Sequence, residues 1–70
     1  MKHHTIKTGD GYWVSTGHFV TNFNTKSVIM GWHTELDGSV KPVLQALGVD
    51  GLSLKAGKWV AEPKFLTVEI

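Results

Sequence analysis

The sequence predicts a small, mostly β domain, and three features lead to that fold class. Turn signals rich in Gly, Asp and Asn recur at short intervals, among them "TGDG" at 8–11, "LDGS" at 36–39 and "KAGK" at 55–58. The stretches between these turns are short and rich in Val, Ile, Thr, Trp and Phe, which favour strands. The chain has 70 residues, so we expect a single domain over 1–70.

The individual strands follow from the spacing of the turn signals. We expect strands at about 3–8, 11–21, 28–36, 52–55, 58–62 and 64–70. Residues 52–62 form either one bent strand or a tight hairpin. The last strand is apolar up to the final residue, which predicts that it is paired on both sides or completed by another subunit.

One segment has the signature of a helix, over about 40–47. Ser39 stands where an N-cap residue belongs, Pro42 falls in the first turn, and Gly48 follows the last turn. These are the positions that each residue type favours at helix ends. The apolar residues between them recur at helical spacing, so we expect a short helix that lies on the sheet.

This order of elements resembles that of the OB-fold, a five-stranded barrel with a helix between its third and fourth strands. We therefore expect a small five- or six-stranded barrel or a curved antiparallel sheet, OB-like or SH3-like, with one short helix near 40–47. The resemblance implies a ligand surface on the two longest strands, 11–21 and 28–36.

The two long strands are expected to pair across the tip "NFNT" at 22–25, with partner numbers that sum to 49. This register places Phe19 opposite Met30, with Trp13 and Trp32 on the same side of the sheet. Because so small a domain needs every large apolar side chain it has, we expect these four residues to form the core.

Charge and composition exclude several functions. There are seven Lys and six acidic residues, a formal net charge of +1, no Arg and no Cys. Without Arg the chain is poorly equipped to read duplex DNA, and without Cys it has no disulfide or thiol chemistry. No apolar run approaches the 18 or so residues that cross a bilayer. We expect a cytoplasmic protein that does not bind membranes.

The sequence predicts neither an enzyme nor a cofactor. No nucleophile elbow, phosphate-binding loop or dinucleotide motif is present. The expected register brings His18, His33 and Glu35 to one face, and these donors suit a transition metal. No further ligand is placed beside them, and the pattern favours polar residues on a solvent-exposed face, so we predict no metal site.

The function we expect is therefore non-catalytic binding. Tyr12, Phe23 and Trp59 are the predicted contact aromatics, because they are the rings least easily placed in the core and because Tyr and Trp are enriched at interface hot spots. Lys26 and Lys58 are predicted at the rim. The partner we expect is another protein, or a second copy in a homo-oligomer, since so small a domain is only marginally stable alone.

An alternative function is binding of single-stranded nucleic acid. Single strands are held by stacking rings and scattered positive charge, without the need for Arg. The same three aromatic residues and the lysines near the predicted turns would supply both.

Overall fold

The computed structural model describes residues 4–48 and 54–68. In these ranges the elements are β1 (Ile6–Lys7), β2 (Trp13–Val14), β3 (Phe19–Asn22), β4 (Thr25–Thr34), β5 (Val40–Leu47), β6 (Leu54–Val60), the 3-10 turn η1 (Pro63–Phe65) and β7 (Leu66–Val68). The mostly β class is confirmed. The outermost residues of the first, fourth and last predicted strands lie outside the described ranges.

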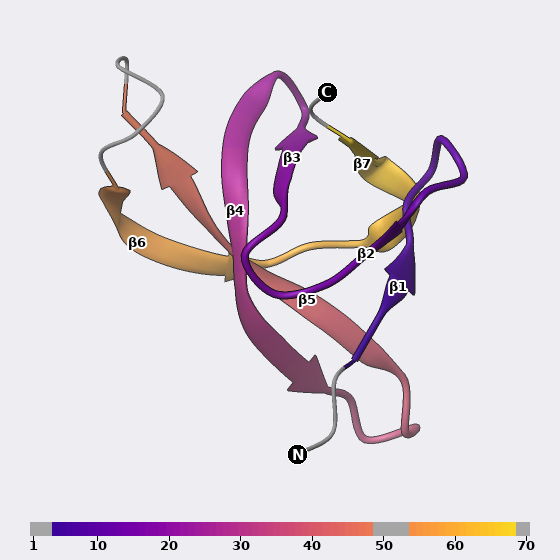
Figure 1. The fold of residues 1–70 in the computed structure, drawn as a ribbon. Coiled ribbons are helices and arrows are strands. Elements are labelled where there is room, and N and C mark those ends of the chain that lie inside the picture. The colour runs from indigo at the N-terminus through magenta and orange to yellow at the C-terminus, as the bar shows by residue number, and fades with distance from the viewer. Residues whose placement is uncertain (1–3, 49–53, 69–70) are drawn as a thin grey trace.

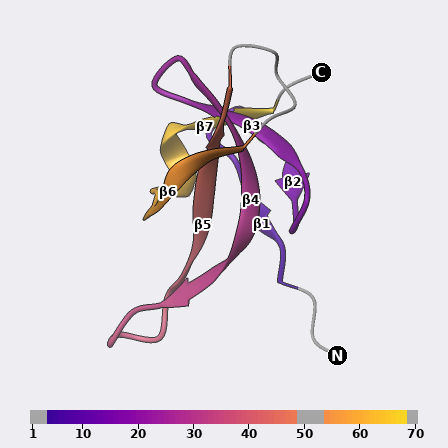
Figure 2. The same cartoon turned by 90° about the vertical axis from the view of Figure 1, so that its left-hand side faces the viewer.

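The strands form two antiparallel sheets (Figure 1). β1 and β2 make a two-stranded sheet, and the other five strands make a sheet in the order β6-β5-β4-β3-β7. In the described residues no pairing joins β6 to β7, so the sheet does not close into a barrel. The β4–β5 hairpin projects beyond the rest of the sheet (Figure 2).

The helix predicted over 40–47 is wrong, because this segment is strand β5. It lies between β4 and β6, where Leu44 pairs with Ile29 on one side and Trp59 on the other. The apolar residues of the segment fit either period, and partners on both sides decide for the strand. Pro42 is accommodated there, and its carbonyl accepts a hydrogen bond of 3.0 Å from the Ala61 N–H.

The predicted strand 11–21 is in fact two strands that belong to different sheets. The chain turns at Gly17, whose φ of 88° lies in the left-handed region that glycine adopts without strain. Before this turn, β2 pairs with β1, and Trp13 lies opposite Lys7. The predicted pairing of Trp13 with the 28–36 strand is therefore wrong.

The predicted β3–β4 register is also wrong, by two residues: Phe19 lies opposite Val28, not Met30. The connection is a two-residue turn at Phe23 and Asn24, with φ values of 48° and 66°. Two successive positive φ angles define the type I′ turn, whose twist matches that of a hairpin. This tighter turn, in place of a four-residue tip, moves the register.

A β-bulge at Met30 changes the direction of the side chains along β4. Ile29 pairs with Leu44 and Gly31 pairs with Val43, so Met30 is the extra residue. Beyond the bulge the alternation is reversed, and Trp32 points to the same face as Ile29. Phe19 and Trp32 therefore do not share a face, as the sequence had predicted.

The core lies between the two sheets. We call the side of the five-stranded sheet that faces β1 and β2 the inner face, and the opposite side the outer face. The core cluster consists of Ile6, Val14, Val20, Ile29, Leu44, Ala61 and Leu66. Trp32, Trp59 and Val68 are partly buried and pack against this cluster.

Three of the four predicted core residues are outside this core. Trp13 is 65% exposed, Phe19 47% and Met30 39%, whereas Trp32 packs against the core as a partly buried residue. Smaller aliphatic side chains fill the narrow space under the β1–β2 sheet, because a close-packed interior selects for shape as well as for hydrophobicity.

The turn between β1 and β2 covers the outer edge of β7. The Gly9 N–H donates to the Leu66 carbonyl at 3.0 Å, and the Val68 N–H donates to the Asp10 carboxylate at 3.1 Å. Asp10 also accepts a hydrogen bond from the Thr8 hydroxyl, which with the Val68 bond lowers the pKa of Asp10. The described part of the last strand therefore pairs with β3 on one side, and on its other edge it is capped by these two hydrogen bonds from the β1–β2 turn.

Candidate binding surface

The outer face of the five-stranded sheet carries exposed apolar side chains from three of its strands, Phe19, Met30 and Val60. One row across four strands runs Phe19, Val28, Gln45 and Lys58. The next row contains Val43 and Val60, with Met30 beside it in the bulge. We call the apolar members of these rows the outer patch: Phe19, Val28, Met30, Val43 and Val60.

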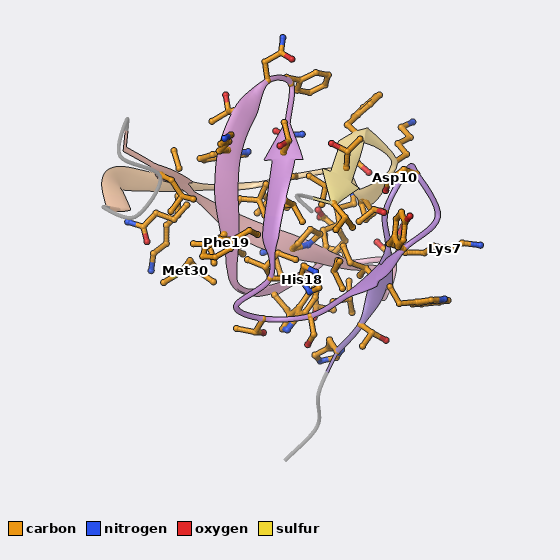
Figure 3. The ribbon with its side chains drawn as sticks, turned by 45° about the horizontal axis from the view of Figure 1, so that its top comes forward. Lys7, Asp10, His18, Phe19 and Met30 are labelled. Atoms are coloured by element: carbon orange, nitrogen blue, oxygen red, sulfur yellow. The ribbon has the colours of Figure 1, made fainter. Side chains whose placement is uncertain are left out.

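The outer patch has a covered centre and exposed surroundings. Val28 is only 8% exposed, whereas Phe19, Met30 and Val60 are 47%, 39% and 44% exposed. Phe19 and Met30 lie away from Lys7 of β1 and Asp10 of the β1–β2 turn (Figure 3). Large apolar side chains that stay exposed close together on one sheet face are the kind of surface that marks interaction sites in soluble proteins.

Charged side chains occupy the two ends of the outer face and differ in sign. Lys26 on β4 and Lys58 on β6 precede the patch along their strands and form what we call the lysine end. Glu35 and Glu62 follow the patch, with Lys41 between them, and form the carboxylate end.

The carboxylate end is held by ion pairs. The Lys41 Nζ lies 2.6 Å from Glu62 and 3.6 Å from Glu35, and the His33 Nε2 lies 3.7 Å from Glu35. The hydrogen bond to Glu62 raises the pKa of Lys41 above 10.5, so the lysine is charged at neutral pH. The two glutamates are therefore held in fixed positions beside the patch.

The tip of the β4–β5 hairpin is a turn closed by hydrogen bonds of Asp37. Asp37 accepts hydrogen bonds from the Ser39 N–H at 2.9 Å and from the Ser39 hydroxyl at 2.7 Å. These bonds lower the pKa of Asp37. Leu36 beside it is fully exposed, and a shallow open hollow lies between this turn and Lys41.

A second exposed aromatic group lies at the β3–β4 tip. Phe23 is 71% exposed, which confirms its predicted exposure. Its ring lies 5.1 Å from that of Phe65, centroid to centroid, at an interplanar angle of 38°. The Lys64 Nζ lies 5.1 Å from the Phe65 ring centroid, a cation–π distance.

The five predicted contact residues are divided among separate regions. Lys26 and Lys58 lie on the outer face, Phe23 at the β3–β4 tip, and Tyr12, 50% exposed, in the β1–β2 turn. Trp59 lies on the inner face beside Leu44, partly buried. Its Nε1–H donates to the Asn22 Oδ1 at 3.2 Å.

Sequence reasoning missed Phe19, Met30 and Val60 as surface residues. It assigned the first two to the core because they are large and apolar, and it took Val60 as an ordinary strand residue. The available signal was that apolar residues stand at successive positions in "SVIM". A strand with one solvated face would alternate apolar and polar residues instead.

Neither a metal site nor a membrane span is found in the described part of the chain. No three His, Cys, Asp or Glu side chains gather there to hold an ion, and of the three candidate donors His18, His33 and Glu35 it is His33 and Glu35 that lie 3.7 Å apart. None of the helical segments in the described ranges has the length and apolar character to cross a bilayer. Comparison with known proteins gives no match to a family model, a curated protein or a solved structure.

Proposed function

We propose that this protein is a non-catalytic binding module that docks onto another protein chain through the outer face of its five-stranded sheet. The observation that carries the proposal is the outer patch, where three large apolar side chains are about 40–50% exposed around a buried Val28. An apolar centre with charged residues around it is the usual anatomy of a protein interface.

The two faces of the five-stranded sheet differ in whether other parts of the chain pack on them, and this difference supports the proposed binding function. The inner face is already filled by β1, β2 and the chain from Ala61 to Leu66. A side chain on the outer face therefore adds little to the core of one chain and is available to a partner. Lys26 and Lys58 lie on the outer face beside the patch, and this position supports their proposed role at the rim.

The finer fold assignment is also a proposal. The meander β3-β4-β5-β6, the 3-10 turn and a last strand that pairs with β3 support a partly open, SH3-like barrel. The β5 strand in place of a helix argues against the OB-like alternative, which needs a helix between its third and fourth strands.

The proposal is tested by photocrosslinking in the cells that make the protein. A photoreactive phenylalanine replaces Phe19, 47% exposed, and in a matched control it replaces Tyr12, an aromatic residue that is 50% exposed in the β1–β2 turn. We expect a protein adduct of defined mass at position 19 and not at position 12. Equal crosslinking at both positions, or none at position 19, would overturn the proposal.

Single-stranded nucleic acid is a second candidate ligand, favoured by the Phe23–Phe65 pair with Lys64 beside it. Exposed rings with a nearby cation are the elements of a stacking site. Trp59 donates to Asn22, the neighbour of Phe23, so its fluorescence reports on this tip. The other two tryptophans, Trp13 and Trp32, are replaced by Phe so that Trp59 alone gives the signal. Oligothymidylate at low salt should change that fluorescence and fail to do so when Phe23→Ala is added; an unchanged signal without Phe23→Ala would exclude this ligand.

A further inference from the structure

The charged and apolar residues of the outer face are arranged symmetrically along the strands. On β6 and its continuation, Lys58 precedes Val60 by two residues and Glu62 follows it by two. On β4 and its continuation, Lys26 and Glu35 lie on either side of the bulge at Met30, four and five residues away. In both strands the order is therefore lysine, apolar centre, glutamate.

This order makes the outer face complementary to itself. A two-fold axis that lies between two facing sheets and crosses the strands at the level of Val60 reverses the direction of each strand. It brings the lysine end of one copy over the carboxylate end of the other, while the outer patches meet in the centre. An interface of this kind is isologous, so each contact occurs twice.

We propose that a second copy of this chain occupies the outer face and forms a two-fold symmetric dimer; this inference rests on the proposed function and names its partner. In this arrangement Lys58 of each copy faces Glu62 of the other, and Lys26 faces Glu35. Facing sheets pack about 10 Å apart with their strands nearly aligned, and reversed strands are compatible with that geometry.

The charges at the two ends favour this partner over an unrelated apolar surface. The lysine end carries two lysines, and the carboxylate end with its hairpin tip carries Glu35, Asp37 and Glu62 against Lys41. Among the side chains that the structure describes, the two ends therefore carry net charges of opposite sign. Complementary potentials fix the register of an interface and exclude wrong partners.

The available area suits a reversible dimer. Four strands about 4.8 Å apart, over roughly nine residues of about 3.3 Å each, give roughly 500 Å² per copy. About 1,000 Å² in total stands at the lower end of specific interfaces. We therefore expect a dissociation constant in the micromolar range, on the order of the weaker complexes of that size.

The test is sedimentation velocity of the purified protein from about 1 µM to about 1 mM, a range that spans the expected dissociation constant. We expect conversion from monomer to dimer across this range, with weaker association at higher salt. Lys58→Glu and Glu62→Lys each place like charges opposite one another twice, and each should weaken the dimer at least about tenfold.

Mixing the two variants separates a lost contact from a damaged fold. In the mixed dimer the substituted position 58 of one variant faces the substituted position 62 of the other, so their exchanged charges attract. The unchanged Lys58 and Glu62 of the same two chains also face each other, and the heterodimer should recover the original affinity within about threefold. A purified protein that stays monomeric throughout, or variants that fail to associate on mixing, would overturn the inference. If the photocrosslink at position 19 then joins a different protein, the proposed function stands with another partner.

Discussion

The two faces of the five-stranded sheet are built from alternating residues of the same strands, and they differ in what covers them. The inner face carries Val20, Ile29 and Leu44, all fully buried. The outer face carries Phe19 and Met30, which are larger than the residues beside them and remain substantially exposed. Size and hydrophobicity therefore do not identify the core here; the covering by the β1–β2 sheet does.

The largest expected effect comes from two neighbours on β4 that point to opposite faces. Ile29→Ala removes a fully buried side chain and leaves a cavity, so we expect a loss of about 2–5 kcal/mol in unfolding free energy. Met30→Ala truncates a side chain that is 39% exposed, and we expect a loss below about 1 kcal/mol. Urea denaturation of both variants measures the difference.

One result for these two variants would contradict the prediction. If the Met30 variant loses as much stability as the Ile29 variant, the outer face is part of the folding core of a single chain. The measurement belongs at low micromolar concentration or below, where association contributes least to the apparent stability.

A second, smaller effect is expected from the contact that holds the β1–β2 turn against the last strand. A Cβ on Gly9 would lie 2.9 Å from the Lys64 carbonyl carbon and closer still to its oxygen. Gly9→Ala therefore pushes the β1–β2 turn away from the last strand, and we expect a loss of about 1–3 kcal/mol. Thermal melts should show a lower Tm by roughly 5–20 °C for a domain of this size.

Gly31→Ala is the matched control for this prediction. A Cβ there meets no atom within 4 Å, and Gly31 lies opposite Val43 on the outer face. We expect a change within about 0.5 kcal/mol. Equal losses for the two glycine variants would mean that the turn between β1 and β2 is not held against the last strand.

The sequence was sufficient for the fold class and for the position of the β3–β4 tip, because turn residues and β-branched residues are local signals. It was insufficient for β5, since Val43 and Leu44 satisfy a helical and an extended pattern alike. The choice between them is made by β4 and β6, which are distant in sequence. The same holds for the division of 11–21 at Gly17, which depends on the pairing of β2 with β1.

The candidate site was harder to predict than the fold. Lys26, Lys58 and the exposed Phe23 follow from local patterns, and all three are exposed in the structure. The outer patch does not follow from them, because the bulge at Met30 reverses the alternation along β4 and no turn signal marks it. Trp59 shows the opposite error, since a ring predicted at the surface is partly buried and hydrogen-bonded to Asn22.

A third prediction concerns the pH dependence of the contact between the β1–β2 turn and the last strand. The Asp10 carboxylate joins the β1–β2 turn to Val68, and its pKa lies below 3.8, chiefly because of the Thr8 hydrogen bond. A carboxyl group whose pKa is lower in the folded state than in the unfolded state stabilises the fold at pH values above its unfolded pKa. This stability is lost as the pH falls through the folded pKa. We expect the Tm to fall between about pH 5 and pH 3, and to fall less in Asp10→Asn.

Asp37→Asn provides the comparison for Asp10. The pKa of Asp37 is lowered too, by its hydrogen bonds to Ser39, but these bonds lie within one exposed turn at the hairpin tip. We expect the acid dependence of the Tm to remain largely unchanged in this variant. If both aspartate variants respond to pH alike, the covering turn contributes no more to stability than the tip.

The smallest effect is expected on the outer face itself. Val60→Thr preserves the β-branched shape that suits a strand and changes a side chain that is 44% exposed. In dilute solution we expect a change within about 0.5 kcal/mol. A second copy that binds only the folded chain raises the Tm with protein concentration, so the unsubstituted protein should gain stability on concentration while the Val60 variant gains less. Identical plots of Tm against concentration for the two proteins would mean that the Val60 side chain contacts only solvent. The outer face would then be exposed without being a binding surface.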